Sequence, residues 1–442
     1  MRLSLWAVIW TGLFLLLAAA PLVVLLLGEM PFGREFWWDF SMALGFAGMA
    51  MMGAQFALTA RFRRASAPFG IDVLYYFHRY FAIFALGVVL SHFAILWFLY
   101  PAELGELDPR VARWELTAGR AALVLFALAV ITSQWRTQLR LEYGLWRYSH
   151  VLLATLGLVA AAAHISGVGY YTASPYKRTL WLALALFWLL LVIWVRFVKP
   201  WVQKRRPYQV VDISEHSARS WTLAIEPVGH AGLAAFKPGQ FAWLTLRASP
   251  YALREHPFSI CSAPEQLPRL EFGIKELGDF TGTIGALKAG ETVYIDGPYG
   301  IFSYENHPDA AGFVFIVGGI GITPILSMLR SMTHRQEKRP VWLFYGNASL
   351  QEIAYRDEVD GAAATLNLQV IHVLQDAAED WSGETGFIDR DILERHLPAD
   401  LPAAGLRYFL CGPKPMLEAT EKALRGMGVS LRHIQSEIFE LV

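Results

Sequence analysis

Four histidines lie within long apolar stretches of the sequence, where a titratable side chain is rare and usually functional. His78 and His92 are 14 residues apart in one stretch, and His150 and His164 are 14 residues apart in another. In an α-helix, fourteen steps of about 100° come within about 40° of four full turns and rise about 21 Å. Both histidines of a pair therefore share one face of their helix, at two different depths.

The two helices that carry these pairs are predicted to run in the same direction, because one further apolar helix separates them along the chain. His78 then faces His150 at one depth, and His92 faces His164 at the other. Haem iron accepts an imidazole as an axial ligand. The spacing therefore predicts two bis-histidine sites, each holding one haem b.

The residues around the histidines leave alternatives open. Small side chains lie between the members of each pair, at Ala82, Ala85, Val89, Ala154, Gly157 and Ala161. They leave room for a flat macrocycle, but small residues also let helices pack closely. Arg79 and Arg147 are candidate partners for the propionates of the inner haem and Arg120 for the outer one, although all three also suit a snorkelling or topology charge.

The elements that must position these histidines are membrane helices. Six segments are apolar and long enough to cross a bilayer: 5–27, 38–60, 74–99, 119–134, 147–168 and 178–198. Of the 442 residues, 55% are hydrophobic and 17% are charged, against roughly 25% charged in an average soluble domain. This composition excludes a wholly soluble protein, a disordered chain and a disulfide scaffold. The first segment exceeds the roughly 7–15 residues of a signal-peptide core, so we expect an uncleaved helix.

The basic residues predict the orientation of these helices. One set of loops carries Arg61, Arg63, Arg64, Arg136, Arg140, Arg147, Lys199, Lys204, Arg205 and Arg206. By the positive-inside rule this set is cytoplasmic, so both termini and everything after residue 200 lie inside. We therefore expect a multi-pass protein of the inner cell membrane. The six apolar segments make a lipid bilayer the expected partner. The 38 basic and 38 acidic residues balance, which predicts no nucleic-acid partner.

The second half of the chain reads as globular sequence in two parts. After a basic linker at 201–206, short alternating runs over 207–310 predict a small antiparallel β-barrel. From 311 to 442 apolar strands alternate with helical stretches, which predicts an α/β Rossmann-like domain with a parallel sheet. The fold class is thus an all-α six-helix transmembrane domain over 1–200, followed by a β-barrel and an α/β domain.

Two short motifs in the barrel segment suit an aromatic ring and a pyrophosphate. In the first motif (His256, Pro257, Phe258 and Ser259), Phe258 offers an aromatic edge and Ser259 a hydroxyl for a ring nitrogen. In the second, Gly278, Thr281 and Gly282 lead into a predicted short helix at 282–287, with Lys275 supplying a positive charge. Backbone N–H groups at a helix start bind phosphate. Taken singly, each motif is also typical of an ordinary turn or strand.

Two glycine turns follow strands of the α/β segment. The first contains Gly318, Gly319, Gly321, Thr323 and Pro324, and the second contains Cys411, Gly412, Pro413 and Met416. A strand, glycine turn and helix let the backbone approach a dinucleotide pyrophosphate, and both turns fall at the carboxyl edge of one sheet. Cys411 also suits a small core position. Whether NADH or NADPH is preferred stays open, because Ser349 but no arginine follows the second strand.

Together these features resemble the ferric reductase and NADPH oxidase superfamily, in its bacterial branch of transmembrane flavocytochromes b, whose dehydrogenase part is similar to ferredoxin-NADP reductase. The resemblance covers almost the whole chain. HPFSI at 256–260 and GDFTG at 278–282 are similar to the flavin motifs of the family, and GGIGITP at 318–324 and CGPKPM at 411–416 to its nicotinamide nucleotide motifs. Glu437-Ile438-Phe439 is similar to the terminal motif whose aromatic ring stacks on the flavin.

The resemblance implies an NAD(P)H-dependent flavocytochrome b oxidoreductase with two haem b, FAD, and NADPH or NADH. Phe439, Cys411 and Ser259 are then expected at the site of hydride transfer. Electrons would leave cytoplasmic flavin and nucleotide domains for a ferric chelate or O2 on the outer side. The equal histidine spacing is more typical of the ferric reductases in the family than of its oxidases. Two alternatives are an electron donor to a periplasmic redox protein or quinone, and a haem- and nucleotide-sensing membrane protein without turnover.

Overall fold

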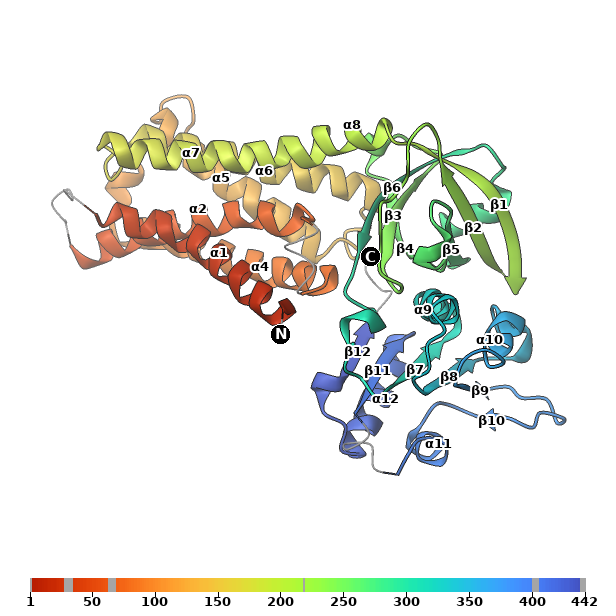
Figure 1. Ribbon diagram of the computed structural model, residues 1–442. Coiled ribbons are helices and arrows are strands. Elements are labelled where there is room, and N and C mark those ends of the chain that lie inside the picture. Colours follow the sequence, from red (N-terminus) through yellow and green to blue (C-terminus); the bar gives the residue numbers. More distant parts are fainter. Residues whose placement is uncertain (1, 28–34, 63–68, 218, 400–404, 438–442) are drawn as a thin grey trace. The chain divides into compact units, whose positions relative to one another are not determined.

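The computed structural model describes residues 2–27, 35–62, 69–217, 219–399 and 405–437 (Figure 1). The chain divides into two compact units. The first contains Met1–Trp201 with Tyr251–Leu253, and the second contains Val202–Pro250 with Arg254–Val442. Phe439, Arg63 and Arg64 of the sequence analysis lie outside the described residues.

The first unit consists of long apolar helices. They are α1 (Arg2–Leu25), α2 (Phe36–Thr59), α4 (Ile71–Leu99), α5 (Trp114–Gln134), α6 (Tyr143–Val168) and α7 (Pro175–Ile193). Within the described ranges, six helices are long and apolar enough to cross a membrane, which confirms the six predicted segments. Helix α5 begins at Trp114, five residues before the predicted start. There the guanidinium of Arg113 donates to Oε1 of Glu115 at 2.7 Å, and its positive charge offsets the negative charge of this carboxylate in the first turn of the helix.

Helix α7 continues beyond its predicted end. A π-helical turn at Trp194–Val198 joins it to α8 (Lys199–Lys204), and the candidate span runs from Pro175 to Lys204. Residues 201–204, which the sequence analysis assigned to a linker, are therefore helical. Basic residues at this end favour the helix because they offset the partial negative charge of its last carbonyls.

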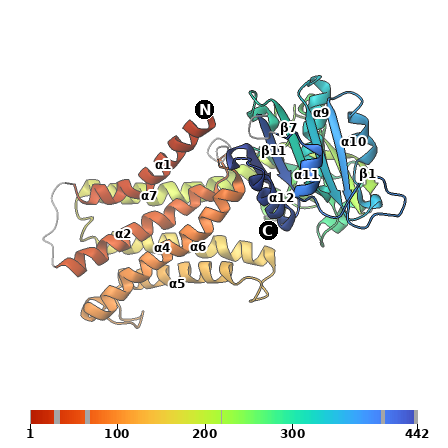
Figure 2. The same cartoon turned by 90° about the horizontal axis from the view of Figure 1, so that it is seen from below.

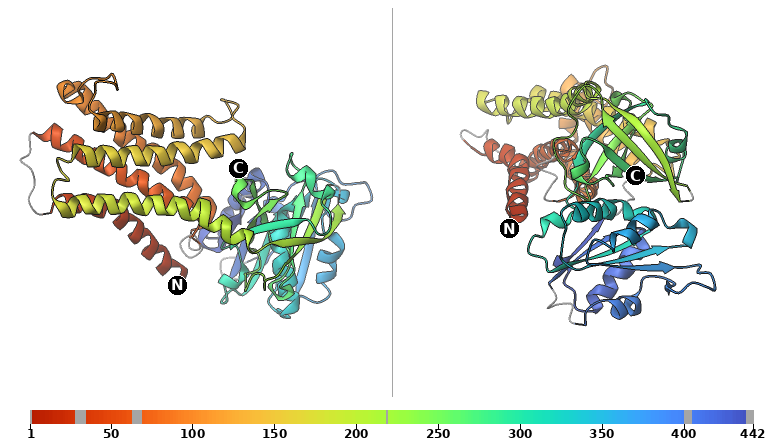
Figure 3. Two further views of the ribbon diagram at one scale, coloured as in Figure 1. Left: turned by 90° about the horizontal axis from the view of Figure 1, so that it is seen from above. Right: turned by 45° about the vertical axis from the view of Figure 1, so that its right-hand side comes forward.

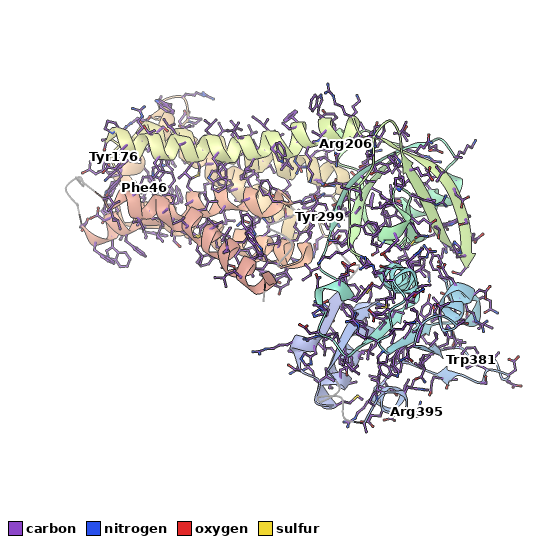
Figure 4. The ribbon with its side chains drawn as sticks, in the orientation of Figure 1. Phe46, Tyr176, Arg206, Tyr299, Trp381 and Arg395 are labelled. Carbon is purple, nitrogen blue, oxygen red and sulfur yellow. The ribbon has the colours of Figure 1, made fainter. Side chains whose placement is uncertain are left out.

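Two helical hairpins form the centre of the first unit. Helix α2 lies beside α4, and α5 lies beside α6 (Figure 2). Met52, Ala85, Ala122 and Phe126 meet in one buried cluster that joins the two hairpins. Phe46, labelled in Figure 4, lies among the membrane helices and packs on Trp181 with ring centroids 4.9 Å apart. The two hairpins carry all four histidines of interest.

The second unit begins with a six-stranded antiparallel sheet (Figure 3). Its strands are β1 (Tyr208–Ser217), β2 (Ser220–Pro227), β3 (Phe241–Leu246), β4 (Glu255–Ser259), β5 (Leu270–Lys275) and β6 (Thr292–Tyr299), in the order β4-β3-β6-β1-β2-β5. The edge strands β4 and β5 meet at a single bridge between Ile260 and Phe272. The predicted antiparallel strands are confirmed, and full closure into a barrel stays a prediction.

A parallel sheet with flanking helices completes the second unit. The strands are β7 (Gly312–Gly318), β8 (Val341–Asn347), β9 (Leu368–Leu374), β10 (Glu384–Thr385), β11 (Leu406–Cys411) and β12 (Ile434–Glu437), in the order β10-β9-β8-β7-β11-β12. The helices are α9 (Ile322–His334), α10 (Arg356–Ala362), α11 (Arg390–His396) and α12 (Lys414–Gly426). The α/β prediction is confirmed. Strands β7 and β11 are neighbours, so both predicted glycine turns leave one edge of this sheet side by side.

Candidate functional site

The first histidine pair meets inside the helical unit. The rings of His78 and His150 lie 6.3 Å apart between centroids, with their planes at 83°. Imidazole nitrogens bind metal ions at about 2.0–2.1 Å, which places the centres of two rings on opposite sides of one ion about 6 Å apart. The observed separation fits two axial ligands of one iron.

The second predicted pair consists of His92 on α4 and His164 on α6. Each has its Nδ1 atom held by a backbone carbonyl of the neighbouring helix, Ser41 O for His92 and Glu115 O for His164, both at 2.8 Å. A carbonyl only accepts hydrogen bonds, so Nδ1 must carry the proton. The lone pair of Nε2 is then available to a metal, the arrangement that orients metal-binding histidines in proteins.

The Nδ1 atoms of the first pair have different surroundings. Ser133 Oγ donates to Ala129 O at 2.6 Å, so its oxygen can accept from His150 Nδ1 at 3.0 Å and from Trp146 Nε1 at 3.2 Å. The buried Nδ1 of His78 has no hydrogen-bond partner among the described residues. Three of the four histidines thus have an acceptor at Nδ1, which favours a proton there and leaves Nε2 for a metal.

Two glycines make room for the imidazoles of the second pair. A methyl group at Gly119 would lie 2.8 Å from Nδ1 of His164, and one at Gly45 would lie 3.2 Å from the ring of His92. Gly157, by contrast, faces the ring of Phe126, which a methyl group would approach to 2.9 Å. Gly157 therefore serves helix packing, one of the two interpretations open from the sequence.

The donor set suits a porphyrin-bound iron better than a bare metal ion. Within the described residues, no group of three or more His, Cys, Asp or Glu side chains converges on one point. A haem needs only two axial side chains, because the macrocycle supplies the other ligands. Buried imidazoles in facing pairs, with Nδ1 tied back, fit this requirement.

The three arginines proposed for haem propionates contact protein acceptors in this structure. Arg79 donates to Gln134 Oε1 at 3.1 Å, Arg120 to Leu104 O at 3.3 Å, and Arg147 to Leu253 O at 2.9 Å. Their propionate role stays a prediction, because each would have to exchange or share its acceptor.

The two predicted flavin motifs meet on the antiparallel sheet. The ring of His256 stacks on that of Phe280 with centroids 3.7 Å apart, and Phe258 lies 6.1 Å from Phe280. His256, Pro257 and Phe258 belong to β4, an edge strand on which proline is tolerated. Phe280 precedes Thr281, so β4 and the glycine-containing loop form one aromatic surface.

Ser259 ends β4 as a buried hydroxyl. The residue is 2% exposed, and its Oγ has no hydrogen-bond partner among the described residues. Burying a hydroxyl without a partner is unfavourable, and native proteins rarely leave one unsatisfied. A ring nitrogen or carbonyl of a bound flavin is a fitting partner for it.

The predicted pyrophosphate loop leads into the predicted short helix, which is a 3₁₀ helix at Thr281–Ala286. Thr281 Oγ1 accepts from the backbone N–H groups of Leu277 and Gly278 at 2.8 and 3.0 Å. Gly278 and Gly282 have open space where a side chain would stand. Lys275 is already paired with Glu352 at 3.0 Å, a partner that the sequence analysis did not identify.

The two glycine turns at the edge of the parallel sheet interlock. A methyl group at Gly321 would lie 2.3 Å from the carbonyl oxygen of Cys411, and one at Gly318 would lie 2.8 Å from Sδ of Met416. A methyl group at Gly412 would approach Cε of Met416 to 2.6 Å. The backbones can meet this closely only because these positions lack side chains.

The start of α9 is shaped for a sharp turn out of β7. Gly319 has φ of +52°, a conformation that glycine adopts without steric cost. Thr323 Oγ1 donates to Ile320 O at 3.0 Å. Pro324 lies in the first turn of the helix, where its missing N–H leaves no bond unmade. Pro413 similarly precedes the start of α12.

Cys411 is fully buried at the end of β11, opposite Glu437 of β12. Burial, together with the nearby Glu437 carboxylate, raises the pKa of the Cys411 thiol well above its ordinary value. Both effects favour the protonated thiol over the thiolate. The described part of β12 ends at Glu437, two residues before Phe439.

The sequence analysis did not identify the residues that contact Nδ1 of the histidines. Ser41, Ser133 and Glu115 act through Nδ1 of the histidines, and two of these contacts use backbone carbonyls, which carry no sequence signal. Ser133 was accessible to inference, because a hydroxyl inside an apolar helix needs a reason. Gly45 and Gly119 were also visible as small residues on the neighbouring helices.

Three protein-family models match successive parts of the chain. Residues 44–161 match a ferric reductase like transmembrane component, residues 223–303 an FAD-binding domain, and residues 315–422 an oxidoreductase NAD-binding domain. The first matched segment contains three of the four histidines. The second includes both predicted flavin motifs, and the third includes both glycine turns. The order of these matches confirms the resemblance drawn from the motifs.

Curated relatives include the NADH-cytochrome b5 reductase 2 of Lodderomyces elongisporus, 33% identical over 40% of this chain and 65% of that protein. The NADH-cytochrome b5 reductase 1 of Debaryomyces hansenii is 34% identical over 38% of this chain and 60% of that protein. This chain thus spans less than two thirds of these relatives. Among solved structures, the ferredoxin reductase in carbazole 1,9a-dioxygenase is 24% identical, with a TM-score of 0.46, over 53% of this chain and 69% of that one.

Proposed function

We propose that this chain, a membrane NAD(P)H oxidoreductase of the ferric reductase and NADPH oxidase type, carries electrons across the bilayer to an acceptor on the outer side, ferric iron or O2. Its resident cofactors would be FAD, held on the antiparallel sheet, and two haem b. His78 and His150 would hold one haem, and His92 and His164 the other. The facing of His78 and His150 across the two hairpins carries the proposal.

When bound, the flavin would take two electrons from the nicotinamide and release them singly, and each haem would take one electron at a time. The protein itself would position the cofactors and shield them from water. Ser41, Glu115 and Ser133 hold the imidazoles through Nδ1, and the buried helical core excludes water. Two histidines would hold each haem, so the acceptor would be reduced without binding the metal.

In the second unit, too, the residues of the predicted site position the cofactors. The turns around Gly321 and Cys411 present backbone to the dinucleotide, and the buried Cys411 thiol keeps its proton. Ser259 offers its unsatisfied hydroxyl to the flavin ring. We further propose that the antiparallel sheet closes as a barrel, that Phe439 covers the flavin, that the helical unit lies in the inner membrane, and that both soluble domains lie in the cytoplasm.

The test uses full-length protein purified after expression with added haem precursor. Under argon, NAD(P)H is expected to reduce the Soret and α bands of a b-type cytochrome, and pyridine haemochrome analysis is expected to give two haems per chain. Ferric citrate or O2 should then reoxidise the haems through many cycles. A sensor would stop after one reduction, and protein without a b-type spectrum would refute the proposal.

A further inference from the structure

Two buried side chains on neighbouring helices of the first unit lack hydrogen-bond partners among the described residues. They are Gln55 of α2, whose Oε1 and Nε2 are both unsatisfied, and His78 of α4, whose Nδ1 is unsatisfied. Gln55 is only 7% exposed. A buried amide with neither atom bonded is rare in proteins, and the helix beside it carries an equally unsatisfied imidazole, so the pair calls for a functional reason.

The register of α2 against α4 places these two residues at one level. Ser41 O contacts His92 Nδ1 at 2.8 Å, and a methyl group at Gly48 would meet Val89. Gln55 follows Ser41 by 14 residues, and His78 precedes His92 by 14 residues. In antiparallel helices, equal steps in opposite directions end at the same depth, and fourteen steps come within about 40° of the starting face.

The other hairpin repeats this construction. The matched positions are Ser41 with Glu115, Gly45 with Gly119, Gln55 with Ala129, and Thr59 with Ser133, each 74 residues apart. The first two pairs make the same contacts with His92 and His164. In the third, the carbonyl oxygen of Ala129 lies 3.4 Å from Nδ1 of His150. Gln55 is the counterpart of Ala129, so the repeat assigns it to the level of His78.

Thr59 occupies the place of Ser133 but is engaged elsewhere. Its hydroxyl donates to Gln55 O at 3.2 Å and to Phe56 O at 3.5 Å, and the structure shows no bond from it to His78. The α2–α4 hairpin thus differs from its counterpart in one respect. No hydroxyl of the described residues contacts the His78 imidazole there, and the polar side chain nearest along α2 is the amide of Gln55, one helical turn earlier.

We propose that Gln55 is the positioning residue of His78. Its Oε1 accepts the Nδ1–H of His78, which fixes the tautomer and leaves Nε2 for the metal. The inference rests on the proposed haem function, and it gives His78 a side-chain acceptor, as Ser133 gives His150. Acceptors at Nδ1 raise the basicity of a ligating imidazole, and a more basic ligand favours ferric over ferrous iron.

The test is a potentiometric titration of the haem bands in the full-length protein. Gln55→Met removes the acceptor at similar volume and should shift the midpoint of the inner haem to a higher potential, with roughly 10- to 100-fold weaker haem retention. Gln55→Glu supplies a stronger acceptor and should shift the same midpoint to a lower potential. Ser133→Ala, which removes the acceptor of His150, identifies the midpoint that belongs to the inner haem.

Thr59→Val is the matched control, one turn away on the same helix, and should leave both midpoints unchanged. Opposite shifts in the Met and Glu variants support the proposal, as does loss of the inner haem from the Met variant alone. The proposal would be overturned if neither Gln55 variant shifts the midpoint, if both shift it in the same direction, or if both lose the inner haem. It would also be overturned if only Thr59→Val has an effect. Wild-type protein without two resolved haems would instead contradict the proposed function itself.

Discussion

His78 and His150 face one another from two different helical hairpins, with ring centroids 6.3 Å apart and planes nearly perpendicular. The pair needs both hairpins, because His78 lies on α4 and His150 on α6. The distance between the rings depends on the buried cluster of Met52, Ala85 and Phe126, which joins the hairpins. Substitutions in that cluster should therefore affect haem content as well as stability.

Replacing His92 by alanine should remove the outer haem and end acceptor reduction, while NAD(P)H still bleaches the flavin. The physical reason is that a single axial imidazole remains at that depth. Pyridine haemochrome analysis should fall from two haems per chain to one. His334→Ala, on the exposed end of α9, is the control and should keep both haems. An unchanged haem content in the His92 variant would contradict the pairing.

Ser259→Ala should weaken flavin binding or slow flavin reduction by roughly 2- to 12-fold, the equivalent of about 0.5–1.5 kcal/mol for one hydrogen bond. The apo fold should be unaffected, because Ser259 Oγ makes no bond to the described protein. FAD titration by fluorescence and stopped-flow reduction measure the effect. Ser303→Ala removes another buried, unsatisfied hydroxyl. Equal losses in both variants would show that Ser259 has no special role.

Gly321→Ala should destabilise the second unit by about 1–3 kcal/mol, the usual cost of overpacking. Its methyl group would lie 2.3 Å from Cys411 O, a backbone atom that cannot turn aside. NAD(P)H oxidation should fall with it. Gly361→Ala in α10 meets nothing within 4 Å and should be neutral or stabilising. Thermal unfolding of the two variants tests this prediction. Equal unfolding temperatures would be incompatible with the interlocked turns.

Lys275 has two competing partners, Glu352 in this structure and the flavin pyrophosphate in our prediction. Lys275→Met should weaken FAD binding, whereas Glu352→Gln should strengthen it or leave it unchanged, because the ammonium group is released. The Lys275–Glu352 pair is partly exposed, so its loss should change stability by no more than about 1 kcal/mol. If both variants weaken FAD binding equally, Lys275 acts through the ion pair and not through the cofactor.

The buried thiols should make stability decrease in alkali. Burial raises the pKa of Cys261 to about 12 and that of Cys411 well above its ordinary value. Their contribution is complete below the unfolded thiol value of about 8.5 and is lost as pH rises from there toward the folded values. Iodoacetamide at pH 9 should label denatured but not native protein. Rapid labelling of native protein would show that the thiols are accessible.

Much of this architecture could be predicted from the sequence because its signals are local. Hydropathy predicted the six helices, and alternating apolar and polar residues predicted the strands. The 14-residue spacing predicted that His78 faces His150. The partners of the histidines could not be predicted, because Ser41 O and Glu115 O are backbone atoms whose role depends on how two helices are registered. The short helix predicted at 282–287 is present as a 3₁₀ helix at Thr281–Ala286, whose type the sequence does not indicate because 3₁₀ and α-helices share the same start signals.

The charges were also harder to place than the apolar residues. Lys275 was assigned to a cofactor from its position beside a glycine motif, but Glu352, which it contacts, is 77 residues later in the sequence. Long-range ion pairs leave no periodicity to detect. The three arginines near the histidines show the same limit, because carbonyl acceptors such as Leu104 O and Leu253 O are invisible in a sequence.

Gly45 and Gly119 give the helical unit an unusual pattern of mutational tolerance. Neither binds anything, yet each defines the space in which an imidazole of the neighbouring helix lies. A saturation screen selecting for haem-bearing protein should therefore find these two positions almost as intolerant as His92 and His164. Gly12 and Gly87, which face open space, should accept many residues, so empty volume, as much as ligand chemistry, would limit how this protein can evolve.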